Sequence, residues 1–86
     1  MPQVGRFLGI TVAMFYGDHP PPHFHARYVE HRAIIEMDTM RVIASWLPPR
    51  ALALVTEWAT RHQAELRENW RLARAHAPLQ TIAPLE

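Results

Sequence analysis

The 86-residue sequence contains no cysteine, no lysine and no apolar run long enough to span a membrane. Without cysteine there are no disulfide bonds, thiolate nucleophiles or cysteine-based zinc sites, so a bound metal would need histidine and carboxylate ligands. All nine basic residues are arginines. Arginine suits bidentate contacts with phosphate, but this bias also follows from the codon usage of a GC-rich genome, the explanation we prefer. The formal net charge of +1 is too small to imply a strong sequence-independent attraction to nucleic acid, although local clusters of arginine could still bind phosphate.

The length predicts a single small domain over residues 1–86, because a chain of this size supports one modest hydrophobic core. A second copy of the chain, in a homodimer, or another protein would be a natural source of further burial. The first residues lack the basic, apolar and cleavage regions of a signal peptide. We therefore expect a cytoplasmic protein that does not contact a membrane.

Histidine and proline are concentrated in one segment. His19, His23 and His25 account for half of the six histidines, and three consecutive prolines, residues 20–22, lie among them. Prolines fix φ and remove backbone donors, so they favour a stiff, extended connection. An all-trans polyproline segment would place the Cα atoms of His19 and His23 about 12 Å apart. One ion would reach both only if a cis proline bent the chain.

Alternating polar and apolar residues after the prolines predict a β-hairpin. His23 and His25 share one face of the first strand, and a second alternating run follows at residues 31–37. A Val29-Glu30 loop, or a four-residue loop in the same register, places Glu36 opposite His23 and on its face. A longer or bulged connection stays open because neither loop residue favours positive φ. A one-residue slip would then move Glu36 to the other face.

Two kinds of chemistry fit His23, His25 and Glu36. The imidazoles could bind zinc or another divalent metal, with the Glu36 carboxylate as a third ligand or as the group that orients a histidine. Alternatively, His23 and His25 could act as acid and base in RNA cleavage, with Glu36 orienting them and Arg27 or Arg32 holding a phosphate. A third interpretation leaves the histidines as solvent-facing strand residues and the prolines as a stiff connection.

The sequence as a whole predicts an α+β fold. Residues 4–8, 10–16 and 41–46 are rich in β-branched and aromatic residues, and each segment predicts a short strand. Together with the hairpin they form an N-terminal antiparallel meander of about four to five short strands within residues 1–46.

One long C-terminal helix is predicted over residues 48–75, because Pro48-Pro49 suits a first helical turn. Its apolar stripe, which would cover the sheet, recurs at three- and four-residue spacing: Ala51, Leu54, Val55, Trp58, His62, Leu66, Trp70 and Ala73. Arg67, Arg71 and Arg74 near its end complement the helix dipole or form a phosphate-binding patch. Residues 76–86 predict an extended tail that docks along the domain or onto a partner.

Five blocks along the chain carry a family resemblance: Met1-Pro2, Asp18–Tyr28, Leu47–Ala51, Glu57-Trp58 and Glu68–Trp70. Together they resemble the small bacterial family labelled domain of unknown function 4160, over nearly the whole chain. That family has no agreed activity, so it supplies no catalytic residues. Its members are often encoded beside a second small protein. The resemblance therefore implies a two-gene, toxin-antitoxin-like module.

The leading functional hypothesis is a partner-binding component of such a module, whose partner is a small protein encoded by a neighbouring gene. The histidine-bearing edge and the C-terminal tail would be its contact surfaces. Two alternatives stay open: a histidine-dependent ribonuclease toxin that acts on RNA, and a zinc-binding structural module.

Overall fold

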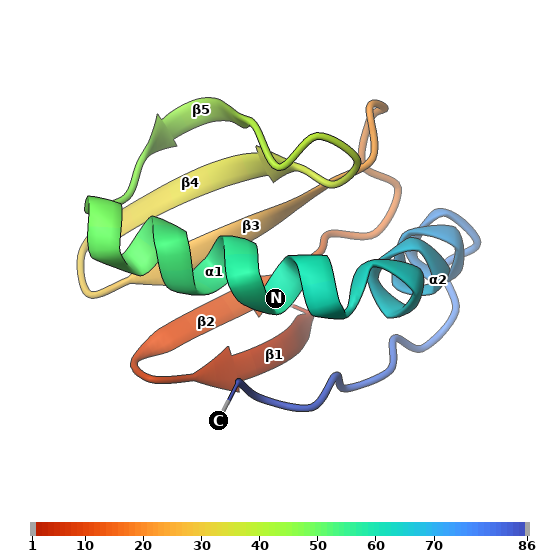
Figure 1. Cartoon of the computed structure of the whole chain (residues 1–86). Helices are drawn as coiled ribbons and strands as arrows, with labels where there is room; N and C mark the ends of the chain where they lie inside the picture. Colours follow the sequence, from red (N-terminus) through yellow and green to blue (C-terminus); the bar gives the residue numbers. More distant parts are fainter. Residues whose placement is uncertain (1, 86) are drawn as a thin grey trace.

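Five antiparallel strands form one sheet and lie side by side in chain order, as the sequence predicts (Figure 1). The fold comes from a computed structural model that describes residues 2–85. The strands are β1 (Gln3–Phe7), β2 (Ile10–Ala13), β3 (His23–Tyr28), β4 (His31–Glu36) and β5 (Val42–Trp46). Leu8 and Gly9 connect β1 to β2 with φ of 49° and 80°, the positive values that a tight hairpin turn requires.

The predicted register of the β3–β4 hairpin is confirmed. His23 pairs with Glu36, and the strands are joined by a two-residue loop that begins at Val29. Val29 has a φ of 55°, which a β-branched residue rarely adopts. Phe24 and Ile35 face each other across the strands and are fully buried. Their burial favours this register over a one-residue slip, which would turn both side chains to the other face.

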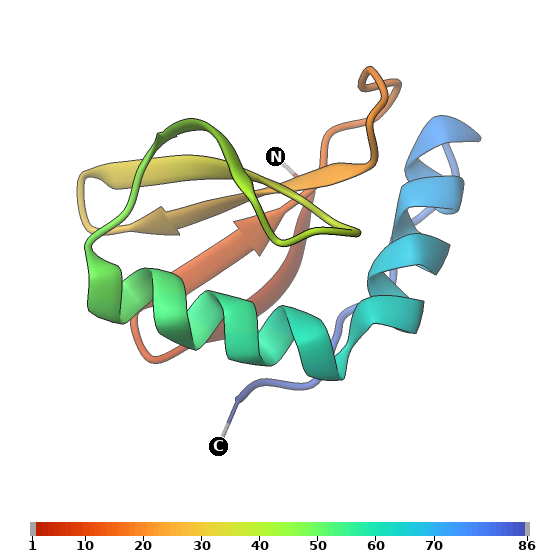
Figure 2. The same ribbon diagram turned by 45° about the horizontal axis from the view of Figure 1, so that its top comes forward.

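Helix α1 (Pro49–Arg61) lies across one face of the sheet and closes the hydrophobic core (Figures 1 and 2). Trp58 is the largest fully buried side chain, and its ring stacks on Phe7 with centroids 5.1 Å apart. Gly5 makes room for this ring, since a Cβ atom there would lie 2.7 Å from it. The other large, fully buried side chains are Phe24, Ile10, Met14, Ile35, Met37, Leu47, Leu66, Ile82, Val4, Val12 and Val55.

The other face of the sheet, which we call the open face, has no helix over it among residues 2–85 (Figure 2). It carries the residues that alternate with the buried ones, including Arg6, Thr11, Arg27 and Arg32. The domain is therefore a two-layer α+β structure with helices on one side only.

The prediction of one long helix is wrong. Two helices are present, α1 and α2 (Gln63–Arg74), separated by His62 with φ −119° and ψ 27°. A continuous helix over residues 48–75 would be about 42 Å long at 1.5 Å per residue, whereas the longest extent of the molecule is 33 Å. The turn at His62 brings α2 back against the domain, where Leu66 and Ala73 are buried (Figure 2). Neither helix has the length and apolar character needed to cross a bilayer, within the residues described.

The C-terminal tail packs against its own domain. Ile82 donates its backbone N–H to the Val4 carbonyl at the free edge of β1, and the Ile82 side chain is buried. The Trp58 indole N–H donates to the Ala83 carbonyl over 2.8 Å. Asn69, which is fully buried, accepts from the Gln80 N–H and donates to the Gln80 carbonyl. The tail is thus part of the fold and covers an edge strand.

Candidate metal centre

The proline-histidine segment forms the connection from β2 to β3, at one end of the sheet. Gly17 turns the chain with a φ of 67°, and its N–H donates to the Ala73 carbonyl at the end of α2. The Pro20-Pro21 peptide is cis. The segment returns so that Asp18 lies beside the first residues of β3.

Asp18, His23 and His25 form a compact group, which we call the triad. Asp18 Oδ2 lies 2.8 Å from His23 Nε2 and 3.4 Å from His25 Nε2. One ligand atom from each residue lies within 4.8 Å of the others. His23 and His25 share the same side of β3 because they are two residues apart. Asp18 reaches them only because the segment folds back.

The position of His23 is fixed at both ring nitrogens. Nδ1 lies 2.7 Å from the Pro21 carbonyl, and Nε2 lies 2.8 Å from the Asp18 carboxylate. A carbonyl oxygen only accepts, so Nδ1 carries a proton, and the lone pair of a neutral imidazole then points at the carboxylate. Two acceptors do not attract each other at this distance. The contact is satisfied by a second proton on Nε2 or by a cation shared between the two atoms.

Several opposing influences act on the Asp18 carboxyl. Burial is the largest single influence and raises its pKa. The His19 backbone N–H, hydrogen bonds from His23 and His25 and the charge of a protonated His23 act in the other direction, so the net pKa lies below the ordinary value of 3.8. Asp18 is therefore an anion near neutral pH, the state in which a carboxylate binds a metal ion.

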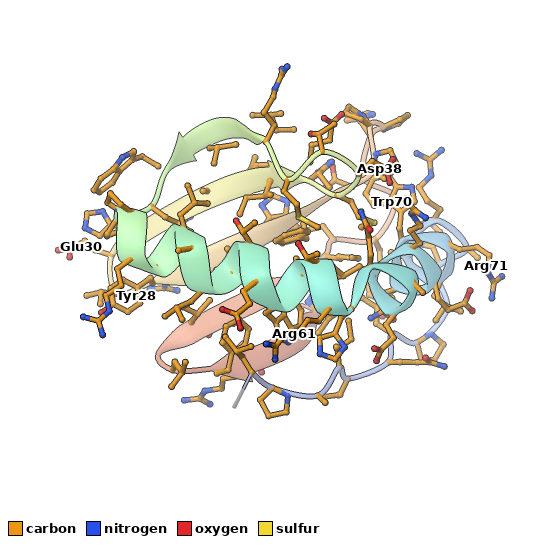
Figure 3. All side chains as sticks on the ribbon, viewed as in Figure 1. Tyr28, Glu30, Asp38, Arg61, Trp70 and Arg71 are labelled. Carbon is orange, nitrogen blue, oxygen red and sulfur yellow. The ribbon has the colours of Figure 1, made fainter. Side chains whose placement is uncertain are left out.

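Helix α2 supports the triad from behind. The Trp70 ring packs on His23 with centroids 5.2 Å apart, at the end of the sheet next to α2 (Figure 3). Arg74 lies over the Trp70 ring and donates through Nη1 to the Asp18 carbonyl over 2.9 Å. On the side of the triad away from Trp70, the Phe15 ring packs edge-on against the His25 ring, with centroids 4.5 Å apart. The turn at His62 is what allows α2 to reach this end of the sheet.

The triad has the chemistry of a divalent metal site. Two imidazole nitrogens and one carboxylate oxygen are ligands for zinc and for other divalent transition metals. Tetrahedral ligands at about 2.1 Å from a zinc ion lie about 3.4 Å apart, so small side-chain rotations would bring the three atoms to that spacing. The Nδ1–H to carbonyl bond of His23 is the arrangement that orients metal-ligating histidines. His25 and Asp18 keep 27% and 23% of their side chains exposed, so solvent reaches the site.

The residues predicted from sequence fall in different places. His23 and His25 lie together, as the alternation predicts, but Asp18 and not Glu36 is the carboxylate beside them. The Glu36 carboxylate instead accepts from the Thr39 hydroxyl, in the turn after β4. His19 is exposed and meets Asp18 only through its backbone N–H.

Arg27 and Arg32, predicted to hold a phosphate, pair with each other across β3 and β4 on the open face. Both are exposed. They lie beyond His25 along the strands, where they border a pocket of about 100 Å³ that His25 also lines.

Sequence reasoning missed Asp18 as a site residue. Asp18 is five residues before His23, and this spacing does not predict a contact if the proline segment is extended. Only the observed path of the loop brings the two side chains together. The one available signal was an acidic residue directly before a histidine-proline run.

A family model matches the chain over residues 9–71, that of a domain of unknown function (DUF4160). The matched region extends from the β1–β2 turn into α2 and contains all three triad residues. Comparisons with curated proteins and with solved structures gave no match. Because the family model covers well over half of the sequence, the chain belongs to the DUF4160 family.

Proposed function

We propose that this protein binds one divalent transition-metal ion, zinc in the first place, through Asp18, His23 and His25. The convergence of their three ligand atoms within 4.8 Å carries the proposal. Chemistry supports zinc, since imidazole and carboxylate are common zinc ligands and zinc accepts four-coordinate sites.

The exposure of the site favours a reactive centre over a purely structural one. Structural zinc sites are usually closed by four protein ligands, whereas catalytic sites have three and leave a position for water. The triad supplies three ligands and lies partly open to solvent. A metal held in this way lowers the pKa of a bound water and supplies a nucleophile for hydrolysis. We therefore propose metal-assisted hydrolysis as the reaction class.

The contacts of His23 weigh against metal-free acid-base catalysis by that residue. An acid or base must reach the substrate with a free ring nitrogen, within hydrogen-bond distance. Both nitrogens of His23 are already engaged, by Pro21 and by Asp18. A metal ligand needs only Nε2 and keeps the bond at Nδ1, which is the arrangement here.

Isothermal titration of the metal-free protein with zinc tests the proposal. We expect one ion per chain. Zinc in hundredfold excess over its dissociation constant should stabilise the fold by about 2.7 kcal/mol. Asp18→Asn and His25→Ala should each weaken binding at least tenfold. His31→Ala is the matched control, because His31 also lies near a carboxylate, 3.9 Å from Glu30, but outside the triad.

Two results would overturn the proposal. One is a folded parent protein that binds neither zinc nor cobalt, nickel, manganese or iron(II). The other is a His31→Ala variant that loses the ion while Asp18→Asn and His25→Ala keep it. In either case the contact between Asp18 and His23 would be an ion pair that holds the loop.

A further inference from the structure

Three arginines lie in one row across the open face of the sheet. Strand pairing places Arg6 of β1 opposite Thr11 of β2, Thr11 opposite Arg27 of β3, and Arg27 opposite Arg32 of β4. Directly paired residues share a face. The row ends at Arg32, because Trp46 of β5, which pairs with Arg32, packs its ring edge-on against His31 with centroids 5.2 Å apart. Three strand spacings of about 4.8 Å separate Arg6 from Arg32, so the arginine row spans roughly 14 Å.

The arginine row has no acidic partners within residues 2–85, whereas three of the five arginines on the helices do. Arg61, Arg67 and Arg71 each lie within 2.9 Å of a carboxylate, on Glu57, Asp38 and Glu68 respectively. Figure 3 shows Arg61 and Arg71 on the helices. Charge is thus distributed unevenly despite a net charge of +1. On the helices only Arg50 and Arg74 have no acidic partner among the described residues, whereas in the row all three arginines lack one, which favours an anionic ligand on the open face.

Aromatic side chains lie beside the arginine row. Phe15 and His25 line the pocket of about 100 Å³ together with Arg27 and Arg32. Positive charge beside exposed rings on a sheet is what binds single-stranded nucleic acid, because arginines contact phosphates and bases stack on rings.

We propose that the open face binds single-stranded nucleic acid, with backbone phosphates on Arg6, Arg27 and Arg32 and a base against Phe15. His25 belongs both to the pocket and to the triad, so the bound strand would continue from the arginine row to the metal. The substrate class of the centre is then a phosphodiester. This assignment of a substrate rests on the proposed metal function, whereas the binding surface does not.

The reaction this implies is hydrolysis of one phosphodiester bond. The oxygen of water bonds to phosphorus as the bond from phosphorus to one ester oxygen breaks. One proton of the water goes to the departing alkoxide, and the other is released when the new phosphomonoester ionises. No oxidant, reductant or further co-reactant is needed.

Fluorescence anisotropy with a labelled 12-nucleotide single-stranded RNA of mixed sequence, in EDTA, tests the surface without the metal. Non-specific binding of this kind has dissociation constants of roughly 1 to 100 μM at physiological salt. Three phosphate contacts predict that affinity falls about 20-fold between 50 and 200 mM salt. Arg27→Ala/Arg32→Ala should weaken binding at least tenfold and reduce the salt effect to about threefold. Both arginines are exposed, so the fold should persist.

Controls and competing ligands separate the outcomes. Arg61→Ala/Arg67→Ala removes the same charge from the helical layer and should leave binding within twofold of the parent. A DNA strand of the same sequence should also bind, since phosphates and stacking do not require the 2′-hydroxyl. Two results would overturn the proposal. If the parent binds poly-glutamate as tightly as RNA, the open face is a surface for acidic proteins. If the two double variants lose the same affinity for RNA, binding is simple charge attraction.

The two proposals fail in different ways. A protein that binds zinc but binds neither RNA nor DNA at low salt overturns the nucleic-acid surface and leaves the metal centre intact. A protein that binds RNA through Arg27 and Arg32 but takes up no metal overturns the phosphodiester substrate and leaves the surface intact. A metal-loaded protein that cleaves the bound strand, with cleavage lost in Asp18→Asn while anisotropy persists, supports both.

Discussion

Replacing Asn69 by alanine should cost this small domain a large part of its stability. Asn69 is fully buried in α2, and its amide makes two hydrogen bonds of 2.8 Å with the backbone N–H and carbonyl of Gln80. Each bond contributes about 1 kcal/mol net, and the partly buried Gln80 backbone groups left without a partner cost up to about 2 kcal/mol more. We therefore expect a loss of roughly 2 to 4 kcal/mol, against a total of about 4 to 13 kcal/mol for a chain of this length.

Urea denaturation followed by circular dichroism measures this loss. The matched control is Gln80→Ala, because the Gln80 side chain is exposed and its backbone makes the same two bonds in the variant. It should change the free energy of unfolding by less than about 0.5 kcal/mol. A loss above 2 kcal/mol also predicts a drop of about 8 °C or more in Tm. If Asn69→Ala unfolds within 0.5 kcal/mol of the parent, the tail is not held as described.

Three glycine and turn positions give further predictions. Gly5→Ala should destabilise the fold by about 1 to 3 kcal/mol, since the new Cβ meets the buried Trp58 ring at 2.7 Å; an unchanged urea midpoint would show that the ring can move aside. Val29→Gly should stabilise the β3–β4 hairpin by roughly 0.5 to 1 kcal/mol, because Val29 is exposed and has positive φ; a lower Tm would contradict this. Gly17→Ala should cost about 1 kcal/mol and weaken zinc binding, because alanine strains the turn before Asp18; zinc affinity equal to that of the parent would argue against a positioning role for this turn.

The sheet was predictable because its pattern is simple. Strict alternation in residues 23–28 and 31–36 leaves one register that buries Phe24 and Ile35 together, and that register is observed. Only the loop left a longer connection open, since Val29 is an unsuitable residue for a tight turn. Burial of the strands outweighs the local strain there.

The division of the helix was not predictable in the same way. His62 lies within an unbroken apolar stripe, and neither proline nor glycine marks the junction. Periodicity describes which side of a helix is apolar, but it does not say how long the surface beneath is. The helix turns because the sheet ends, which is a property of the whole fold.

The candidate site was predicted in part. The two imidazoles were found from their spacing, but the carboxylate was assigned to Glu36 from strand pairing when Asp18 is the one in contact. Strand pairing predicts where the backbone of a residue lies but not the direction of a long side chain. The Glu36 side chain points towards Thr39 and accepts a hydrogen bond from its hydroxyl. The path of a proline loop is set by contacts with α2, which the sequence did not place there.

A protein partner and a two-gene module remain predictions. The tail is the less suitable contact surface of the two suggested by the sequence, because it is bound to β1, Trp58 and Asn69. Co-expression with the neighbouring gene product, followed by co-purification, tests the partnership, and the histidine-bearing edge is where we expect contact.

Anomalous diffraction at the zinc absorption edge, from crystals grown with zinc, would locate the metal ion that we propose. We expect one strong peak per chain, about 2.0 to 2.2 Å from Asp18 Oδ2, His23 Nε2 and His25 Nε2. A peak elsewhere, such as between His31 and Glu30, or no peak at a well-ordered triad, would contradict the proposal.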